Sequence, residues 1–477
     1  MKREYESVIG LEVHVELATR TKIFCGCKTD FGASPNTQVC PVCLGMPGAL
    51  PVLNKRVVEL AVAVGLATNC QITEKCRFDR KNYFYPDNPQ NYQISQLYLP
   101  ICRDGWLETE TQGEKRKMRI REIHMEEDAG KLFHEEQGGR TLVDHNRAGV
   151  PLIEIVTEPD ARSAEEVISF LEQLRMTIGY LEASDCKLQE GSMRVDVNLS
   201  VREVGATHLG TRTEMKNLNS FHAIVRAISA ERERQIQELE AGREVMMETR
   251  RWDDAKGESF SMRSKEEAKD YRYFPDPDLP PVYVSREWIG EIRARQPELR
   301  EEKRKRYESQ YGLPAYDAEI LTKSVHVARL FEATVEQGIT PKKVSNWLMG
   351  EGLRIFREKE MDPEDAKLSP EGFAALIRMN EKKQISNAVA KEVFEIAIMT
   401  GIDPEGYVHE KGLMTIQNEE ILRENAVRVI RENEKSVADY LSGKEKALGF
   451  LVGQTMKAMK GQADPATVTA LLKELLK

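Results

Sequence analysis

The sequence predicts an α+β protein, in which a domain built on a mixed or antiparallel sheet precedes an all-α domain and a small helical tail. Up to about residue 290, short stretches alternate apolar and polar residues, as half-buried strands do. Beyond the proline-rich segment 276–281, apolar residues recur with helical spacing, and prolines stand where helices begin. The chain has 477 residues, which is enough for about three domains.

The clearest strands place apolar residues on one face and ionisable residues on the other. Residues 10–17, GLEVHVEL, put Glu12 and His14 on the polar face of the first strand. Residues 192–203 put Asp196 on the polar face of a later one. Both patterns are typical of antiparallel strands that pack one face against a core.

The clearest helix of the first domain is expected at residues 163–181, where Ser163 and Glu166 have the spacing of a capping box. Later helices are expected to begin at four prolines, Pro297, Pro341, Pro370 and Pro465. We therefore expect a sheet domain, a helical domain and a tail domain at residues 1–294, 295–405 and 406–477.

The composition excludes some broad classes of protein. With 69 basic and 78 acidic residues the net charge is -9, which is not the balance of a protein that coats nucleic acid, although a local patch could still bind RNA. No run approaches the ~18 apolar residues that a membrane span needs. The first residues, MKREYESVIG, contain no apolar signal core. We expect a soluble, cytoplasmic protein.

Other expected strands also present carboxylates. Glu154 lies among apolar neighbours in residues 150–160, where an unpaired charge would be costly. Residues 119–131 contain a run of acidic residues near their end. One concave face could then collect Glu12, His14, Glu126 or Glu127, Glu154 and Asp196. A solvated polar face is the alternative for any single strand, but together these oxygens suit Mg²⁺ or Mn²⁺.

A magnesium ion held by carboxylates usually accompanies a phosphate-bearing substrate. Basic residues would then bind the phosphates, and the candidates are Arg80, Lys81, Arg147, Arg194 and Lys216. An ordinary surface ion pair is the alternative for each of them. The sequence has no G-x-x-x-x-G-K-[ST] and no G-x-G-x-x-G motif, so ATP, if it is used, would lie on the acidic sheet.

Four of the eight cysteines are close together in the sequence, at Cys25, Cys27, Cys40 and Cys43. Four thiolates at this spacing in a reducing compartment favour a tetrahedral structural Zn²⁺ over free thiols. The first pair is one residue tighter than the usual spacing. The remaining cysteines are scattered and are expected to be small buried residues.

Long motifs occur in a fixed order along the chain: GLEVHVEL, FDRKNYFYPDNPQNYQISQ, HMEEDAGK, PLIEIVTEPD, EMKNLNSF, DYRYFPDPDLPP and NWLMGEG. They resemble the B-subunit family of the bacterial aspartyl/glutamyl-tRNA amidotransferases, and the resemblance extends from about residue 7 to GFLVGQTMKAMKGQADP in the tail.

The resemblance implies an ATP-dependent carbon–nitrogen ligase. Its substrate would be misacylated tRNA, that is, tRNA(Gln) carrying Glu or tRNA(Asn) carrying Asp, whose side-chain carboxylate is phosphorylated by ATP. Ammonia, released from glutamine by an amidase-type A subunit, would then displace the phosphate. A small C subunit would complete a heterotrimer.

The resemblance also assigns metal binding to three residues, His14, Glu127 and Glu154. Glu12 and Asp196 are expected beside them and complete the candidate catalytic and metal-binding set. Strand parity with His124 favours Glu126 in place of Glu127. A turn beginning at Glu126 would break that parity, and the sequence of residues 128–130 is compatible with a turn. Glu127 is therefore the expected ligand.

The tail is expected to contact tRNA outside the active site. Lys457 and Lys460 are three residues apart and would share one face of a helix. Such contacts would position phosphates and would not read sequence. A solvated helix face is the alternative.

Two other functions compete with this hypothesis. A stand-alone metal-dependent kinase or ligase of a small carboxylic acid would use the acidic sheet but would not need the helical domain and tail. A zinc-containing RNA-binding protein without catalysis would leave Glu154 unexplained in its apolar strand. ATP turnover that depends on aminoacylated tRNA separates all three.

Overall fold

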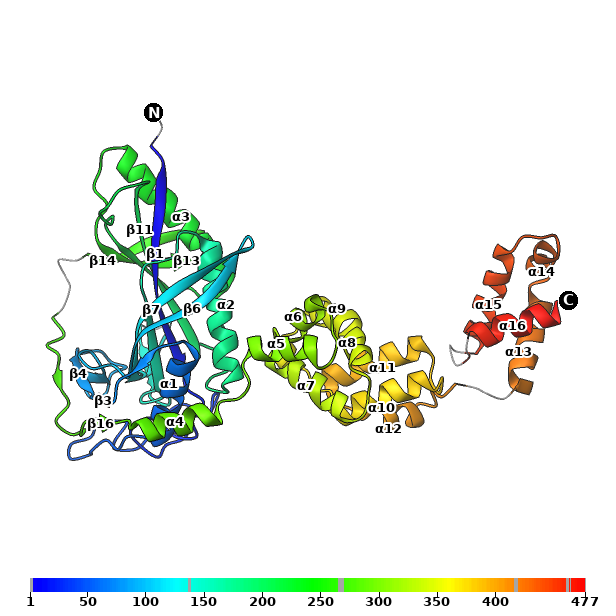
Figure 1. The fold of residues 1–477 in the computed structure, drawn as a ribbon, viewed down its shortest axis with the longest axis horizontal. Helices are drawn as coiled ribbons and strands as arrows, with labels where there is room; N and C mark the ends of the chain where they lie inside the picture. Colours follow the sequence, from blue (N-terminus) through cyan, green and yellow to red (C-terminus); the bar gives the residue numbers. More distant parts are fainter. Residues whose placement is uncertain are drawn as a thin grey trace. The chain divides into compact units, whose positions relative to one another are not determined.

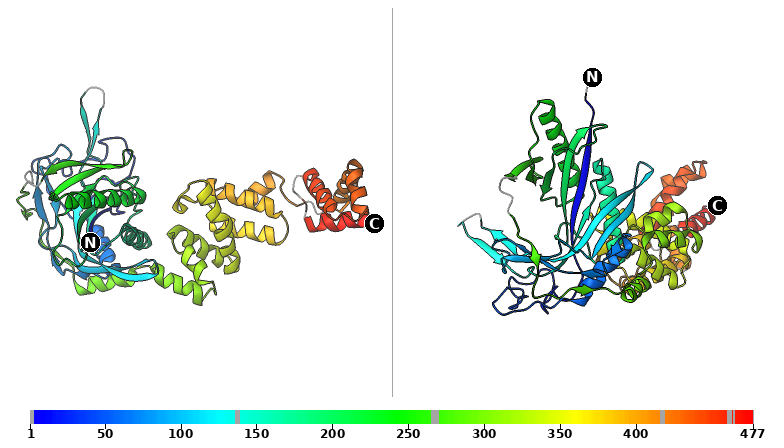
Figure 2. Two further views of the ribbon diagram at one scale, coloured as in Figure 1. Left: turned by 90° about the horizontal axis from the view of Figure 1, so that it is seen from above. Right: turned by 60° about the vertical axis from the view of Figure 1, so that its left-hand side comes forward.

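The computed structural model describes residues 3–135, 139–264, 270–415, 419–459, 463 and 465–476. The chain divides into two compact units, Met1–Leu299 and Arg300–Lys477. The first unit is built on a large sheet with helices packed against it, and the second consists of helices (Figures 1 and 2). The predicted α+β class is confirmed.

A nine-stranded sheet organises the described part of the first unit, in the order β14-β13-β12-β11-β1-β10-β7-β6-β2. All neighbours are antiparallel except β12 and β13. The strands are β1 (Tyr5–Glu16), β2 (Gln71–Ile72), β6 (Cys102–Thr111), β7 (Glu114–Glu127), β10 (Pro151–Thr157), β11 (Met193–Glu203), β12 (Thr213–Lys216), β13 (Glu248–Asp253) and β14 (Glu258–Ser264). Because β1 is the central strand, its side chains have paired neighbours on both sides.

One face of this sheet packs against α1 (Lys55–Ala67), α2 (Ala164–Tyr180) and α3 (Phe221–Glu240) (Figure 1). The apolar parity of β1 is buried in the same hydrophobic cluster as these helices, as Val13 shows with no exposed surface. The polar parity therefore faces away from the helices, as the alternation in the sequence predicts.

The helix expected at residues 163–181 is α2, and its N-terminal cap is the expected Ser163, which accepts a hydrogen bond from the Glu166 N–H. The other half of the capping box differs from the expectation. The Glu166 carboxylate accepts from the N–H of Arg162, one residue earlier, at 2.7 Å. Ser163 thus supplies the accepting side chain and Arg162 the donating backbone N–H, where a capping box would use Ser163 for both.

Small sheets and a short helix complete the first unit. The three-stranded sheet β15-β4-β5 lies beside the end of β7, since β5 contacts β7. The remaining elements are β3 (Lys75–Cys76), β4 (Asp79–Asn82), β5 (Tyr92–Ser95), β8 (Lys131–His134), β9 (Thr141–Asp144), β15 (Phe274–Pro275), β16 (Val282–Tyr283) and α4 (Arg286–Arg295).

The second unit has two hydrophobic clusters. The first joins α5 (Arg300–Ser309), α6 (Ala315–Leu321), α7 (Val325–Glu336), α8 (Pro341–Trp347), the π-helix η2 (Leu348–Gly352), α9 (Leu353–Glu358), α10 (Pro370–Glu381), α11 (Asn387–Thr400) and α12 (Pro404–Glu410). The short 3-10 helix η3 (Pro363–Asp365) lies between α9 and α10 in the sequence. The second joins α13 (Glu419–Glu432), α14 (Glu434–Leu441), α15 (Lys446–Ala458) and α16 (Pro465–Leu475).

Three of the four expected helix starts are confirmed, because α8, α10 and α16 begin at their prolines. The start expected at Pro297 is wrong, since α5 begins at Arg300. Gln296 has extended dihedral angles, which a residue before proline prefers, and the chain stays non-helical until the second unit begins.

The division into three domains remains a proposal. Val408 of α12 is buried in the first cluster of the second unit, so residue 406 lies inside a helix that packs with the helical domain. We accordingly place the second boundary after Thr415. Among the described residues, no helix has the length and apolar character needed to cross a membrane.

Candidate functional site

A row of ionisable side chains crosses the open face of the sheet. His14 of β1 pairs with Glu154 of β10 on one side and with Arg194 of β11 on the other. Glu154 pairs in turn with His124 of β7. Directly paired residues point to the same face of a sheet, so all four side chains lie together on the polar face.

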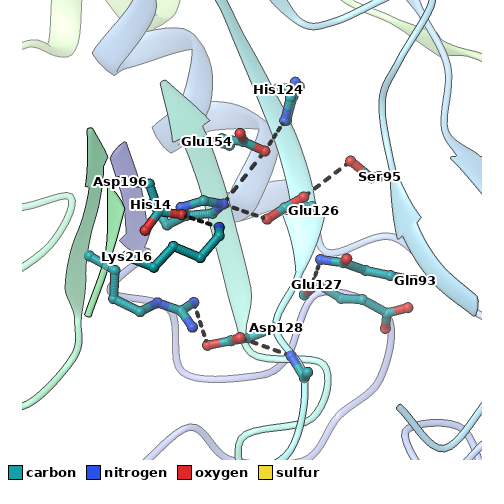
Figure 3. A network of polar contacts seen from close by, with 12 residues as sticks. His14, Gln93, Ser95, His124, Glu126, Glu127, Asp128, Glu154, Asp196 and Lys216 are labelled. Atoms are coloured by element: carbon teal, nitrogen blue, oxygen red, sulfur yellow. Dashed lines mark hydrogen bonds and ion pairs between the residues drawn. The ribbon is translucent and has the colours of Figure 1, made fainter. Parts of the chain in front are cut away.

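The centre of this row is a cluster of two imidazoles and two carboxylates (Figure 3). His14 Nε2 lies 3.6 Å from both Glu126 Oε1 and Glu154 Oε2, and His124 Nε2 lies 2.6 Å from Glu154 Oε2. One atom each from His14, Glu126 and Glu154 falls within 4.8 Å of the others. The geometry suits a small, hard divalent cation.

The electrostatics of the cluster follow from burial and proximity. Burial opposes protonation of His14, but the hydrogen bond and charge of Glu154 outweigh it and raise the pKa of His14 to about 9. Burial would raise the pKa of Glu154, yet His124 and His14 together hold it well below its usual range. Glu154 is therefore ionised and firmly oriented, as a carboxylate that binds a cation must be.

Glu126, and not Glu127, lies in this cluster. The turn expected at Glu126 does not form, because β7 continues as a strand to Glu127 and the parity with His124 is kept. The Glu127 carboxylate turns to the other side, where it accepts from the Ile94 N–H at 2.9 Å and from the Gln90 amide at 2.7 Å. Burial raises the pKa of Glu127 to about 8.

A second carboxylate cluster lies on the neighbouring strands, formed by Glu12, Asp196 and Glu214 within 4.8 Å of one another. Lys216 Nζ donates to Asp196 Oδ2 at 2.7 Å (Figure 3). It also lies 2.8 Å from Glu214 Oε1. Glu12 accepts from Asn198 Nδ2 at 2.9 Å. An ammonium between two carboxylates already supplies positive charge here, which distinguishes this cluster from the one around His14.

Two of the expected phosphate-binding arginines instead contact Asp128, just beyond the end of β7. Arg194 Nη2 lies 2.9 Å from Asp128 Oδ2, and Arg147 Nε lies 3.4 Å from the same atom. Arg147 also donates to the carbonyls of Ala129 and Gly130. These arginines contact the segment that follows β7, and each is paired with the Asp128 carboxylate.

The other two expected phosphate-binding residues differ from each other. Arg80 is paired with Asp276 at 2.8 Å and with Asp278 at 2.6 Å, and its guanidinium stacks 4.1 Å from the Tyr92 ring centroid. Lys81 has no carboxylate partner among the described residues, and its Nζ lies 5.1 Å from the Tyr271 ring centroid. Of the five candidates, Lys81 is the one whose charge is not already paired.

The four clustered cysteines come together as the spacing predicts. Their Sγ atoms lie within 4.8 Å of one another, and the described cysteines form no disulfide. The loop that bears them is hydrogen-bonded to the segment that precedes β10. Asn36 donates to the Asp144 carboxylate and accepts from the His145 N–H, and Asn146 donates to the Ser34 carbonyl. The donor set fits tetrahedral zinc.

Comparison with known proteins identifies the family of this chain. Residues 7–290 match the family described as the GatB/GatE catalytic domain, and residues 329–476 match the one described as the GatB domain. The chain is also 63% identical to the B subunit of the aspartyl/glutamyl-tRNA(Asn/Gln) amidotransferase of Agathobacter rectalis, over 99% of this chain and 100% of that one. The chain belongs to the amidotransferase B-subunit family.

Further members of the B-subunit family give the same result. Proteins of the same name from Lachnospira eligens and Thermoanaerobacter sp. are 61% and 55% identical. The alignments cover 100% and 99% of this chain, and 100% and 99% of the two relatives. The family that the motifs predicted is therefore confirmed.

Both carboxylate clusters and the cysteine cluster lie within the region that matches the catalytic domain of the B-subunit family. In the tail, Lys457 is exposed on α15, whereas Lys460 lies outside the described residues. Sequence reasoning missed Glu214 and the role of His124 beside Glu154. Strand alternation could have indicated Glu214, because Glu214 and Lys216 share a parity in the motif EMKNLNSF.

Proposed function

We propose that this chain, as a member of the B-subunit family, converts tRNA(Gln) carrying Glu, tRNA(Asn) carrying Asp, or both, into the amidated forms by activating the side-chain carboxylate with ATP. Family membership over the full chain supports the reaction. The observation that supports its location is the cluster of His14, Glu126 and Glu154 on the open face of the sheet.

The chemistry requires activation because a carboxylate is a poor acyl donor at neutral pH. Transfer of the γ-phosphoryl group of ATP to a carboxylate oxygen releases ADP and forms an acyl phosphate. Ammonia then attacks the acyl carbon, inorganic phosphate leaves, and a proton is lost as the amide forms. The protein must hold the two anionic reactants together and offset their charge.

Mg²⁺ or Mn²⁺ fits the first cluster, where His14, Glu126 and Glu154 would hold it. Bound there, the cation would offset the negative charge on the phosphate oxygens. His124 positions Glu154 through its 2.6 Å contact. Glu127 has no part in this assignment, since its carboxylate is engaged by Ile94 and Gln90.

We propose that the phosphates of ATP contact Lys81 and Lys216. Lys81 has no carboxylate partner among the described residues, and Lys216 lies on the strand beside Asp196. Asp196 and Glu214 position the Lys216 ammonium, and Glu12 borders the same cluster. Arg80, Arg147 and Arg194 would act by fixing the surrounding segments, through their contacts with Asp276, Asp278 and Asp128.

Zinc fits the cysteine cluster, with Cys25, Cys27, Cys40 and Cys43 as its four ligands. Four protein thiolates leave no open coordination position, so this metal would be structural. It would hold a loop whose hydrogen bonds run to residues 143–146.

We further propose that ammonia comes from an amidase-type A subunit, and that a small C subunit completes a heterotrimer that works in the cytoplasm on misacylated tRNA. The relatives carry the name of a B subunit, which denotes one part of a larger enzyme. The sequence has no G-x-S-x-G motif for a glutaminase nucleophile, which agrees with a separate source of ammonia.

Phosphate release tests this proposal directly. The assembled complex is supplied with ATP and ammonium, and with Glu-tRNA(Gln), the same tRNA uncharged, or no tRNA. We expect phosphate release only with the charged tRNA, together with Gln-tRNA(Gln) as product. Asp-tRNA(Asn) in a parallel reaction identifies the second substrate. Release that is indifferent to tRNA would point to a kinase of a small acid.

The assignment of Glu126 leads to a specific prediction. Glu126→Gln should weaken Mn²⁺ binding at the sheet by at least about 10-fold, because it removes a charged ligand. Glu127→Gln should leave Mn²⁺ affinity within about 2-fold, because that side chain faces Gln90. Electron paramagnetic resonance of free Mn²⁺ measures both. A larger loss of Mn²⁺ affinity in Glu127→Gln than in Glu126→Gln would show that Glu127 is the metal ligand.

Removal of the tail should weaken tRNA binding without disturbing the catalytic cluster. A chain ending at Thr415 keeps Val408 and the rest of the first cluster of the second unit. We expect tRNA affinity to fall by about 10-fold or more as phosphate contacts are lost, while Mn²⁺ affinity stays unchanged. Filter binding at fixed salt measures the first. Unchanged tRNA affinity would show that the tail does not contact tRNA.

A further inference from the structure

Lys22 is a buried lysine beside the cysteine cluster. Lys22 has no exposed surface. Its Nζ donates to Cys43 Sγ at 3.5 Å and to the His145 carbonyl at 3.3 Å. Within the part of the chain that the structure describes, no carboxylate lies within ion-pair distance of this ammonium. Its nearest potentially anionic neighbour is therefore a cysteine sulfur.

This environment is unfavourable unless the sulfur is charged. A buried ammonium without an anion loses its hydration and gains little from a neutral thiol, which is a weak acceptor. Four thiolates on one Zn²⁺ have a net charge of about −2, because metal-bound cysteines are deprotonated. An ammonium against Cys43 would offset part of that charge. This step depends on the zinc assignment in the proposed function.

The position of Lys22 also connects the cysteine cluster to the segment around Asp128. The Nζ atom reaches the carbonyl of His145, while the next residue, Ile23, donates its N–H to the Gly149 carbonyl at 3.0 Å. Gly149 donates to the Asp128 carbonyl at 2.9 Å. Between His145 and Gly149 lies Arg147, whose side chain fixes Ala129 and Gly130 beyond β7.

Gly149 shows how closely these parts pack. Its φ is +83°, and a Cβ there would lie 3.5 Å from Lys22 Cδ and 3.5 Å from Cys43 Cβ. The lysine stem thus fills the space between the cysteine loop and the backbone that leads into β10. A residue in this position affects both the charge and the placement of the cluster.

We propose that Lys22 is the internal counter-charge of the metallated cysteine cluster, and that it positions Cys43 against the segment 145–149. It is a positioning residue, since it would act on the zinc through a ligand. The Lys22 ammonium should stabilise the Cys43 thiolate through a charge-assisted hydrogen bond, and the thiolate should then bind zinc more tightly.

The test uses the full-length chain with Lys22→Met, which keeps an unbranched side chain one atom shorter and removes the charge. Lys28→Met is the matched control, because Lys28 lies in the same loop but is 75% exposed in its side chain. Each is also made in a background in which all four clustered cysteines are serine. Competition with a chromophoric chelator measures zinc affinity, and urea unfolding measures stability.

We expect Lys22→Met to weaken zinc binding by about 10- to 100-fold and Lys28→Met to leave it unchanged. In the serine background, Lys22→Met should be neutral or stabilising, because no carboxylate of the described residues lies within ion-pair distance of the lysine there. Zinc affinity unchanged in Lys22→Met would overturn the proposal, as would an equal loss of stability in both backgrounds. If Lys22→Met is insoluble, solubility in the serine background supports the proposal, and insolubility there contradicts it.

The same titration separates this inference from the zinc assignment. A wild-type chain that binds one zinc while Lys22→Met binds it equally well removes only the role of Lys22. A wild-type chain that binds none removes the zinc assignment and Lys22 with it, and leaves the amidation reaction untouched.

Discussion

Replacement of Glu154 with Gln is expected to lower ATP-dependent amide formation by about 10²- to 10³-fold. Glu154 is the carboxylate that contacts both His14, at 3.6 Å, and His124, at 2.6 Å. The amide has nearly the same shape but no charge, so it weakens the site for a divalent cation without opening a cavity. Single-turnover formation of Gln-tRNA(Gln) by the assembled complex measures the loss.

The fold should survive this substitution. The charge of Glu154 raises the pKa of both histidines. Without that charge the two imidazoles can stay buried in their neutral form. Glu108→Gln is a suitable control, since Glu108 is an exposed strand residue paired with Lys115 away from the cluster. Assembly with the partner subunits and the unfolding midpoint should match the wild type. Near-normal activity of Glu154→Gln would remove the metal site from this face of the sheet.

The second large effect is expected when the cysteine cluster is broken. Replacing Cys40 and Cys43 together with Ser should abolish zinc binding and destabilise the first unit by more than about 3 kcal/mol. Within residues 25–46 only Cys43 is buried, so the metal would be the main internal constraint on this loop. Metal analysis and urea unfolding under reducing conditions measure the two effects.

Breaking the cluster should also reduce amidation, because the loop binds residues 143–146 and these lead to Arg147 and Asp128. Cys70→Ala is the matched control, since Cys70 is a buried cysteine outside the cluster. Limited proteolysis should cut the double variant between residues 25 and 46 and spare the control. A double variant with wild-type stability would show that the cysteine loop folds without metal.

Much of the fold follows from local patterns in the sequence. Strand alternation in residues 10–17 and 192–203 predicted both the strands β1 and β11 and the face on which Glu12, His14 and Asp196 lie. The helix starts predicted at Pro341, Pro370 and Pro465 were correct. Proline favours the first helical position through its own fixed φ and missing N–H, so this signal is local. The start at Pro297 failed where the chain passes from one compact unit to the next.

The candidate site was predictable only in part. His14 was identified as an ionisable residue on the polar face of its strand, and Glu154 as a carboxylate among apolar neighbours. Glu127 was preferred to Glu126 because a turn was expected at Glu126, and that premise was wrong. The end of β7 is set by its pairing with β10, which continues to Glu127. Because successive residues of a strand point to opposite faces, one further residue of strand determines whether Glu126 or Glu127 faces His14.

The family, the fold class, the polar faces of the strands and the grouping of the four cysteines could all be predicted, because each depends on residues that are near in sequence or on long ordered motifs. Which charges meet depends on tertiary packing. Strand register across β11, β1, β10 and β7 brings Glu126 and Glu154 to His14, and places Lys216 between Asp196 and Glu214. The burial of Lys22 against Cys43 was equally invisible in the sequence. Coulomb interactions depend on distances of a few ångströms in a low dielectric, and those distances exist only once remote segments have packed.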